Sequence, residues 1–129
     1  MNKYQDNELK FDYPIDWVVE KDTDTIAVFN PSKGLGALQF SIYTVPNPKD
    51  ASMKGILADY TKGRHNHVEI FDKKSYVSSN YVDGEGGTCW KYFLCLKNTI
   101  ATFATYNCDK KDIGIEDEIV DDIVKSAFE

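Results

Sequence analysis

Residues 88–97, TCWKYFLCLK, form the stretch that decides the fold. Successive side chains of a β-strand point to opposite faces of the sheet. Here both sets are apolar: Trp90, Tyr92, Leu94 and Leu96 on one face, and Cys89, Phe93 and Cys95 on the other. A strand that is apolar on both faces belongs in the interior of a sheet, with a covering layer on each side. The stretch therefore predicts a three-layer arrangement.

The segments around this strand predict an antiparallel meander. VEIF at 68–71 and SYVSSNYV at 75–82 precede it, and a glycine-rich loop at 83–87 leads into it. A tight turn around Asn98 then connects it to TIATFATYN at 99–107. A three-residue turn at 97–99 would place Trp90 opposite Tyr106, whereas a slip of one residue would place Asn107 there.

Further outward, three more strands and two helices are expected. LKFDY at 9–13, TIAVFN at 25–30 and LGALQFSIYTV at 35–45 have strand composition, with a turn at 30–34 between the last two. Met53, Ile56, Leu57 and Tyr60 have helical spacing, with Pro48 and Asp50 marking the start and Gly63 the end. A second helical stripe occupies 115–128: Ile119, Val120, Ile123, Ala127 and Phe128.

This element order predicts an α+β fold, in which a mainly antiparallel sheet is flanked by two helices as an α/β/α sandwich. The length of 129 residues suits one globular domain spanning 1–129. The interior strand at 88–97 supplies the common core of that domain.

FDYPIDW at 11–17, AVFNPSKGLGALQFSIY at 27–43 and the final IVKSAF at 123–128 resemble the PsbP-like fold. That group includes a photosystem extrinsic protein, a Ran-binding nuclear import factor and small bacterial domains of unknown function. The resemblance covers nearly the whole chain and implies a binding or assembly role, since its members are mostly adaptors. It brings no catalytic residues to these positions.

Composition limits the classes of partner. Twenty-one acidic residues against fifteen basic ones give a net charge of −6, which disfavours nucleic acid and membrane surfaces. Three cysteines without a Cys-x-x-Cys spacing favour a reducing compartment. We therefore expect an acidic cytoplasmic protein, unless an export signal preceded this sequence.

RHNHVEI at 64–70 contains both histidines of the chain. On a strand, His65, His67 and Glu69 would project from one face as three candidate metal ligands. No fourth ligand is evident, and polar residues between a helix and a strand are ordinarily solvated. The sequence therefore favours no metal and no cofactor, with this triplet as the alternative.

Two other groups of side chains have both a structural and a functional interpretation. The cysteines Cys89, Cys95 and Cys108 are expected to be core residues rather than nucleophiles. The acidic group at 116–122 is expected to be a solvated helix face, and its first carboxylates are expected to interact favourably with the positive end of the helix dipole. The alternative is that this group attracts a basic partner.

Four aromatic residues of the meander could line a binding groove: Tyr81, Trp90, Tyr92 and Tyr106. The function expected is a small non-catalytic binding domain that recognises a protein partner near the 83–87 loop. The alternative is a small enzyme or ligand carrier that uses His65, His67 or a cysteine beside a cleft.

Overall fold

The computed structural model describes residues 1–46 and 51–129. Its elements are β1 (Asn2–Gln5), β2 (Lys10–Tyr13), β3 (Val18–Lys21), β4 (Ile26–Phe29), β5 (Gly36–Thr44), α1 (Met53–Thr61), β6 (Ile70–Asp72), β7 (Val77–Ser79), β8 (Val82–Asp83), η2 (Glu85–Gly87), β9 (Thr88–Lys97), β10 (Ile100–Asp109), η3 (Lys110–Asp112) and α2 (Asp117–Phe128). In the described residues, all strand pairs are antiparallel.

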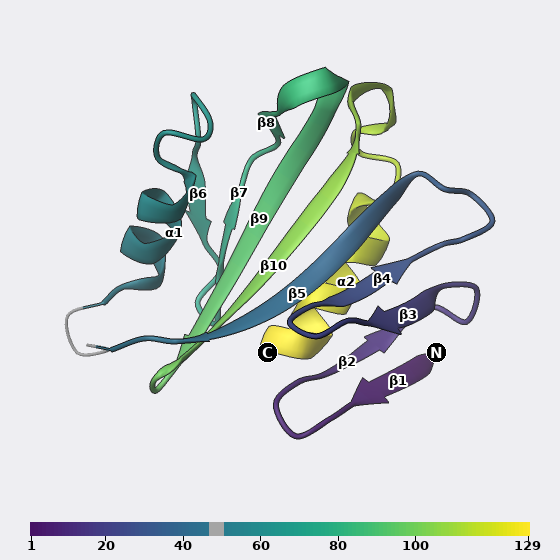
Figure 1. The fold of residues 1–129 in the computed structure, drawn as a ribbon, viewed down its shortest axis with the longest axis horizontal. Helices are drawn as coiled ribbons and strands as arrows, with labels where there is room; N and C mark the ends of the chain where they lie inside the picture. Colours follow the sequence, from purple (N-terminus) through teal and green to yellow (C-terminus); the bar gives the residue numbers. More distant parts are fainter. Residues whose placement is uncertain (47–50) are drawn as a thin grey trace.

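The main sheet has the order β3-β4-β5-β10-β9-β7-β6, with β8 paired to β9. The strand β9 begins and ends as the sequence predicted, and it lies inside the sheet between β10 and β7. The two helices lie over opposite faces, with α2 passing behind β10 and β5 (Figure 1). The α+β prediction is confirmed.

The two faces of β9 belong to different cores, as its sequence predicted. Phe93 and Cys95 join the larger core, in which α2 and the separate β1-β2 hairpin cover the sheet. Tyr92 and Leu94 join the smaller core, which is closed by Leu57 of α1. Because successive side chains of β9 point to opposite faces of the sheet, this one strand contributes residues to both cores.

The helix α1 covers only part of its face. It packs on β9, β6 and β7, and no helix of the described part of the chain lies over β3, β4 and β5 on that side (Figure 1). Residues of β5 that point to this side, such as Gln39 and Ser41, are half-buried. The sheet therefore has an uncovered half-face next to α1.

The helix ends agree with the stripes in the sequence. Ser52 caps α1 by accepting a bond from the Gly55 backbone N–H, and the predicted starting residues Pro48 and Asp50 lie outside the described residues. The helix ends at Thr61, and Gly63 adopts a positive φ of 80°. No helix in the described residues is long and apolar enough to cross a membrane.

Several predicted strands differ in detail. The segment 75–82, predicted as one strand, is divided into β7 and β8, because Asn80 bonds instead to the loop after α1. Its side chain accepts from the Glu69 N–H at 2.7 Å and donates to the His67 carbonyl at 3.0 Å. The strand predicted at 68–71 forms only at β6. The polar strands β1 and β3 were not predicted, since NKYQ and VVEK lack a clear apolar alternation.

The register of the β9-β10 hairpin is the slipped alternative. Lys97 pairs with Ile100, so the turn has two residues and Asn98 adopts a φ of 56°. Asn107 is consequently opposite Trp90, and Tyr106 is opposite Lys91. Because side chains alternate, this register sends Trp90 and Tyr106 to opposite faces of the sheet.

Candidate functional site

The candidate site is a groove of about 570 Å³ where α1 meets the uncovered half-face of the sheet. We call it the α1-side groove. The groove is lined by the sheet strands β5, β9 and β10, by α1 and the loop after it, and by the β8-β9 connection. Its lining residues are Gln39, Ser41, Tyr60, Arg64, His65, Gly84, Glu85, Thr88, Trp90, Tyr92 and Thr105. Its volume is typical of sites for small ligands and short segments.

The floor of the groove is a row of polar side chains held in register by the sheet. Thr105 of β10 pairs with Gln39 of β5 on one side and with Tyr92 of β9 on the other. Gln39 and Thr105 are half-buried, so their polar ends are partly open to solvent. The floor can therefore offer hydrogen bonds to a ligand without moving the backbone.

One wall is formed by Tyr60, Tyr92 and Trp90. These rings belong to a continuous series of aromatic contacts, which we call the aromatic cluster and which continues outside the groove lining through Phe103 and Tyr43. Trp90 and Tyr92 stack with an angle of 8° between planes and 6.4 Å between centroids. Tyr60 of α1 meets Tyr92 edge-on at 5.7 Å and Phe103 at 5.1 Å. Tyr43 contacts Phe103 at 5.5 Å and is 55% exposed.

His65 is fixed against this wall by both ring nitrogens. Its Nε2 lies 2.6 Å from the Tyr92 hydroxyl oxygen, and its Nδ1 lies 3.0 Å from the Asp83 carbonyl oxygen. Burial raises the pKa of Tyr92 to about 12, so its hydroxyl keeps its proton at neutral pH. A carbonyl only accepts, so Nδ1 donates to Asp83, and in the neutral imidazole Nε2 then accepts from the Tyr92 hydroxyl. This pairing leaves no free base on His65.

Arg64 and Glu85 are the charged side chains that line the groove together with His65. The Nε of Arg64 donates to the Tyr60 carbonyl at 2.9 Å, and its guanidinium carbon lies 4.6 Å from the centre of the Tyr60 ring. These contacts hold the guanidinium in place, while its remaining N–H groups can bind an anion. Glu85 is exposed in the β8-β9 connection.

The structure places the four candidate aromatic residues on two faces. Trp90 and Tyr92 line the α1-side groove. Tyr81 lines a separate hollow beside α2, where its hydroxyl donates to Asp117. Tyr106 is 1% exposed and donates to the buried Glu116 at 2.6 Å. Only two of the four can therefore contact one ligand.

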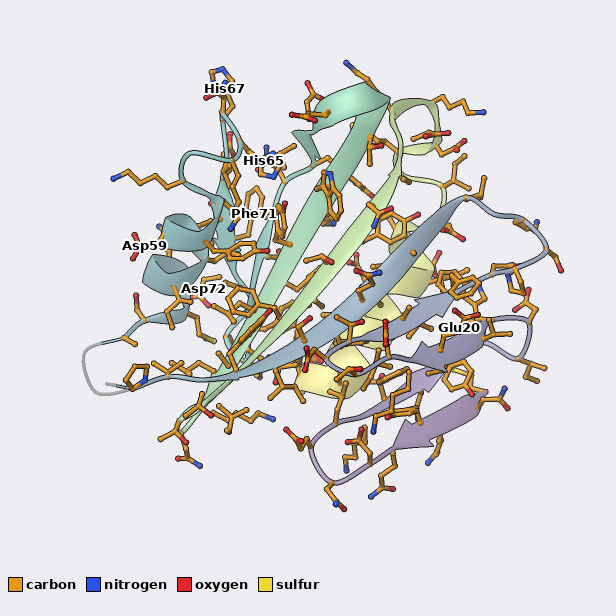
Figure 2. All side chains as sticks on the ribbon, viewed as in Figure 1. Glu20, Asp59, His65, His67, Phe71 and Asp72 are labelled. Carbon is orange, nitrogen blue, oxygen red and sulfur yellow. The ribbon has the colours of Figure 1, made fainter. Side chains whose placement is uncertain are left out.

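The histidine triplet, the alternative to the favoured interpretation of no metal, does not share one face of a strand. His65, His67 and Glu69 lie in the loop after α1 rather than on a strand, and His67 has a φ of 58°. His67 projects from the tip of this loop, away from His65 (Figure 2). In residues 1–46 and 51–129 no three histidine, cysteine or carboxylate side chains gather as a metal site. The strand alternation that grouped these residues was wrong.

The cysteines lie in the core, as predicted, and all three are free and buried. Burial raises the pKa of each thiol. Cys89 and Cys108 are opposite each other on β9 and β10. None of the three lines the α1-side groove, so this groove has no cysteine nucleophile.

The acidic group at 116–122 is more structural than predicted. Glu116 is buried, Asp117 accepts from Tyr81, and Asp121 lies 3.9 Å from Lys91. Asp117 and Glu118 occupy the first turn of α2, where their negative charges interact favourably with the positive end of the helix dipole. Part of the acidic group thus holds α2 on the sheet through polar contacts, and part of it faces solvent.

Sequence reasoning missed Gln39, Tyr60, Arg64 and Thr105 as neighbours of Trp90. Tyr60 was identified only as part of the helical stripe, and its place beside Phe103 depends on the packing of α1. The alternation along β5 could have indicated Gln39 and Ser41, because both interrupt an apolar strand on the same face. The pairing of β5 with β10 could not be inferred from that pattern.

Two solved structures are similar to this chain. One is a crystal structure from Bacteroides thetaiotaomicron VPI-5482, with a TM-score of 0.66 and 14% identity over 93% of this chain. The other is the solution structure of cyanobacterial PsbP (CyanoP) from Synechocystis sp. PCC 6803, with a TM-score of 0.66 and 12% identity over 98% of this chain. The chain spans 44% of the first structure and 90% of the second.

No family model matches the sequence, and no curated protein matches it. The likeness to the two structures therefore concerns the fold alone. It confirms that the chain has the PsbP-like fold that its sequence resembles.

Proposed function

We propose that this chain is a non-catalytic binding domain that holds a segment of a partner protein in the α1-side groove. The observation that carries the proposal is the aromatic cluster beside the polar floor of an uncovered half-face. Tyrosine and tryptophan are enriched at interfaces because they combine apolar area with a polar tip. In this proposal the 129 residues act as one domain.

The chemistry of the groove supports binding over catalysis. Both nitrogens of His65 are engaged, and the hydroxyl of Tyr92 has a raised pKa of about 12. A general base needs a free nitrogen or carboxylate within reach of the substrate proton. Within the described residues, the one carboxylate that lines the groove belongs to the exposed Glu85, and none of the three buried cysteines lines it.

The second candidate function is a small enzyme or ligand carrier that uses His65. The observation in its favour is that His65, Tyr92 and Arg64 converge on one groove. Such a role would require ligand binding to break the His65–Tyr92 bond and release Nε2. His65→Asn would then abolish turnover, whereas a binding domain would lose only part of its affinity.

The net charge of −6 supports a polypeptide partner rather than nucleic acid or an anionic membrane. Three free thiols support a reducing compartment, and the cytoplasm is the compartment we propose.

The proposal is tested by affinity capture from the native lysate, followed by titration with the purified partner. Trp90→Ala is expected to weaken binding of that partner by about 1–3 kcal/mol. Phe71→Ala is the matched control, because Phe71 is 43% exposed and lines the hollow on the α2 side. Equal affinities of the wild-type protein and Trp90→Ala would contradict a role for the groove.

A further inference from the structure

The α1-side groove lies on the face of the sheet and not at its edge. The floor residues Gln39 and Thr105 are each paired on both sides, Gln39 with Ala27 and Thr105, and Thr105 with Gln39 and Tyr92. A ligand in the groove therefore cannot add a strand by ladder hydrogen bonds. Its backbone must be satisfied by water and by side chains of the protein.

A polyproline II helix meets this requirement. It has no internal hydrogen bonds, its backbone is fully solvated, and its proline residues are already restricted in conformation. Recognition of such segments uses grooves lined by aromatic rings, with a few side-chain donors directed at the backbone carbonyls. An extended β-segment would instead leave unpaired N–H groups above the sheet.

The aromatic cluster provides the flat surfaces that proline rings need. Tyr60 is 37% exposed and stands at 71° to Tyr92, which is itself only 5% exposed and supports the nearly parallel Trp90 ring from beside it. Trp90 is half-buried, so part of the indole remains accessible. Its ring is confined by Gly84, where an added Cβ would lie 2.7 Å from the indole Nε1. The wall is therefore formed before a ligand binds.

The polar side chains of the groove match the exposed carbonyls of the ligand. The Gln39 amide and the Thr105 hydroxyl, both half-buried, can donate from the floor. A proline-rich backbone presents carbonyls but few N–H groups, so donors are what it requires. The floor thus offers two side-chain donors.

Arg64 adds a preference for charge. Its guanidinium is held against the Tyr60 ring by the bond from Nε to the Tyr60 carbonyl. A guanidinium fixed in this way suits a carboxylate, which it can bind through two parallel N–H bonds. The exposed Glu85 also lines the groove and disfavours an acidic residue next to it. An acidic residue is therefore expected at one end of the ligand.

We propose that the α1-side groove binds a proline-rich segment in the polyproline II conformation, with an acidic residue paired to Arg64. This inference rests on the proposed function, because it names the class of partner segment for the same groove.

The test uses the full chain and two synthetic peptides of equal length. One contains consecutive prolines and a single terminal glutamate, and the other replaces the prolines with threonine and serine. Amide NMR titration is expected to yield binding of the proline peptide, with shifts at Gln39, Tyr60 and Thr105. The threonine-serine peptide should bind at least about tenfold more weakly. Equal affinities for the two peptides would overturn the inference.

Variants locate the site. Trp90→Ala should weaken binding of the proline peptide about tenfold or more, whereas Phe71→Ala should leave it unchanged. Arg64→Gln should weaken binding of the proline peptide by about threefold to tenfold, and it should leave unchanged the binding of a third peptide in which glutamine replaces the terminal glutamate. Lys62→Gln, a charge change in the same exposed loop, is the matched control. Equal losses from Arg64→Gln and Lys62→Gln would overturn the assignment of Arg64.

The peptide result and the proposed function can fail separately. If the proline peptide does not bind while the captured partner still depends on Trp90, the groove is a binding site and the polyproline inference is wrong. If the proline peptide binds with an affinity that Trp90→Ala does not change, the inference is also wrong, because the peptide occupies another surface.

Discussion

The imidazole Nε2 of His65 lies 2.6 Å from the hydroxyl oxygen of Tyr92, and this contact joins the loop after α1 to the central strand β9. His65 is partly buried, and its ring also packs on Tyr92 with 5.4 Å between centroids. The same loop is held by Asn80 through Glu69 and His67. One wall of the α1-side groove is therefore fixed to the sheet by side chains rather than by strand pairing.

Tyr92→Phe is expected to destabilise the protein by about 1 kcal/mol, because it removes this hydrogen bond and keeps the ring. The free energy of unfolding from urea titration measures the effect. Tyr43→Phe is the control, since Tyr43 is 55% exposed and its hydroxyl can be replaced by water. Equal stabilities of Tyr92→Phe and wild type would mean that the His65 contact contributes little.

Gly84→Ala is expected to move the Trp90 ring. The backbone at Gly84 has a φ of −113°, which alanine accepts, but the added Cβ would lie 2.7 Å from Nε1 and 2.8 Å from Cδ1 of Trp90. The indole N–H signal of Trp90 should therefore shift in an NMR spectrum, while that of Trp17, buried in the other core, should not. A spectrum with both indole signals unmoved would contradict this packing.

Glu116→Gln is expected to change the pH dependence of stability. Burial raises the pKa of Glu116, although the bond from the Tyr106 hydroxyl acts in the opposite direction. A carboxyl with a raised pKa contributes stability that is complete below its unfolded pKa of about 4.3 and is lost as pH rises through the folded pKa. Glutamine has no such loss and can still accept from Tyr106.

The stability of Glu116→Gln relative to wild type should therefore increase as the pH rises from about 4 toward 7. Unfolding free energies at several pH values measure this difference. Glu118→Gln, at an exposed position in the first turn of α2, is the control and should lack that rise. A constant difference between Glu116→Gln and wild type would be inconsistent with the raised pKa.

Asp6→Asn is expected to destabilise the β1-β2 hairpin by about 1 kcal/mol at neutral pH. Asp6 accepts from the Tyr4 hydroxyl at 2.6 Å and from the backbone N–H groups of Glu8 and Leu9. The Tyr4 bond is the main cause that lowers the pKa of Asp6 to about 2. A carboxyl with a lowered pKa contributes stability that is present when the pH is above its pKa in the unfolded chain. This stability is lost as the pH falls toward 2.

The destabilisation caused by Asp6→Asn should accordingly become smaller as the pH falls from about 4 to about 2. Amide exchange of the hairpin residues at each pH provides the measurement. Glu8→Gln is the control, because Glu8 is exposed in the same turn. A destabilisation that stays constant down to pH 2 would contradict the lowered pKa of Asp6.

The three cysteines are expected to resist alkylation in the folded protein. Each is buried, and burial raises the pKa of each thiol, which lowers the fraction of reactive thiolate. Mass spectrometry after iodoacetamide treatment should detect slow modification in buffer and three modified residues in denaturant. Rapid labelling of a single cysteine in buffer would favour the enzyme alternative.

The sequence by itself determined those features that depend on alternation within a segment. The two apolar faces of residues 88–97 placed this strand inside the sheet with a layer on each side, and β9 begins and ends at the predicted residues. The stripe from Met53 to Tyr60 likewise located α1. Both patterns are local, because the direction of a side chain follows from its position in a strand or helix.

The tertiary structure decided which side chains share a site. A turn of two residues rather than three placed Asn107 opposite Trp90, and this single step put Tyr106 in the core beneath α2. It also placed Thr105 between Gln39 and Tyr92. Register depends on turn geometry and on pairing between segments far apart in sequence, neither of which a periodic pattern specifies. The α1-side groove therefore became visible only when β5, β9, β10 and α1 were assembled.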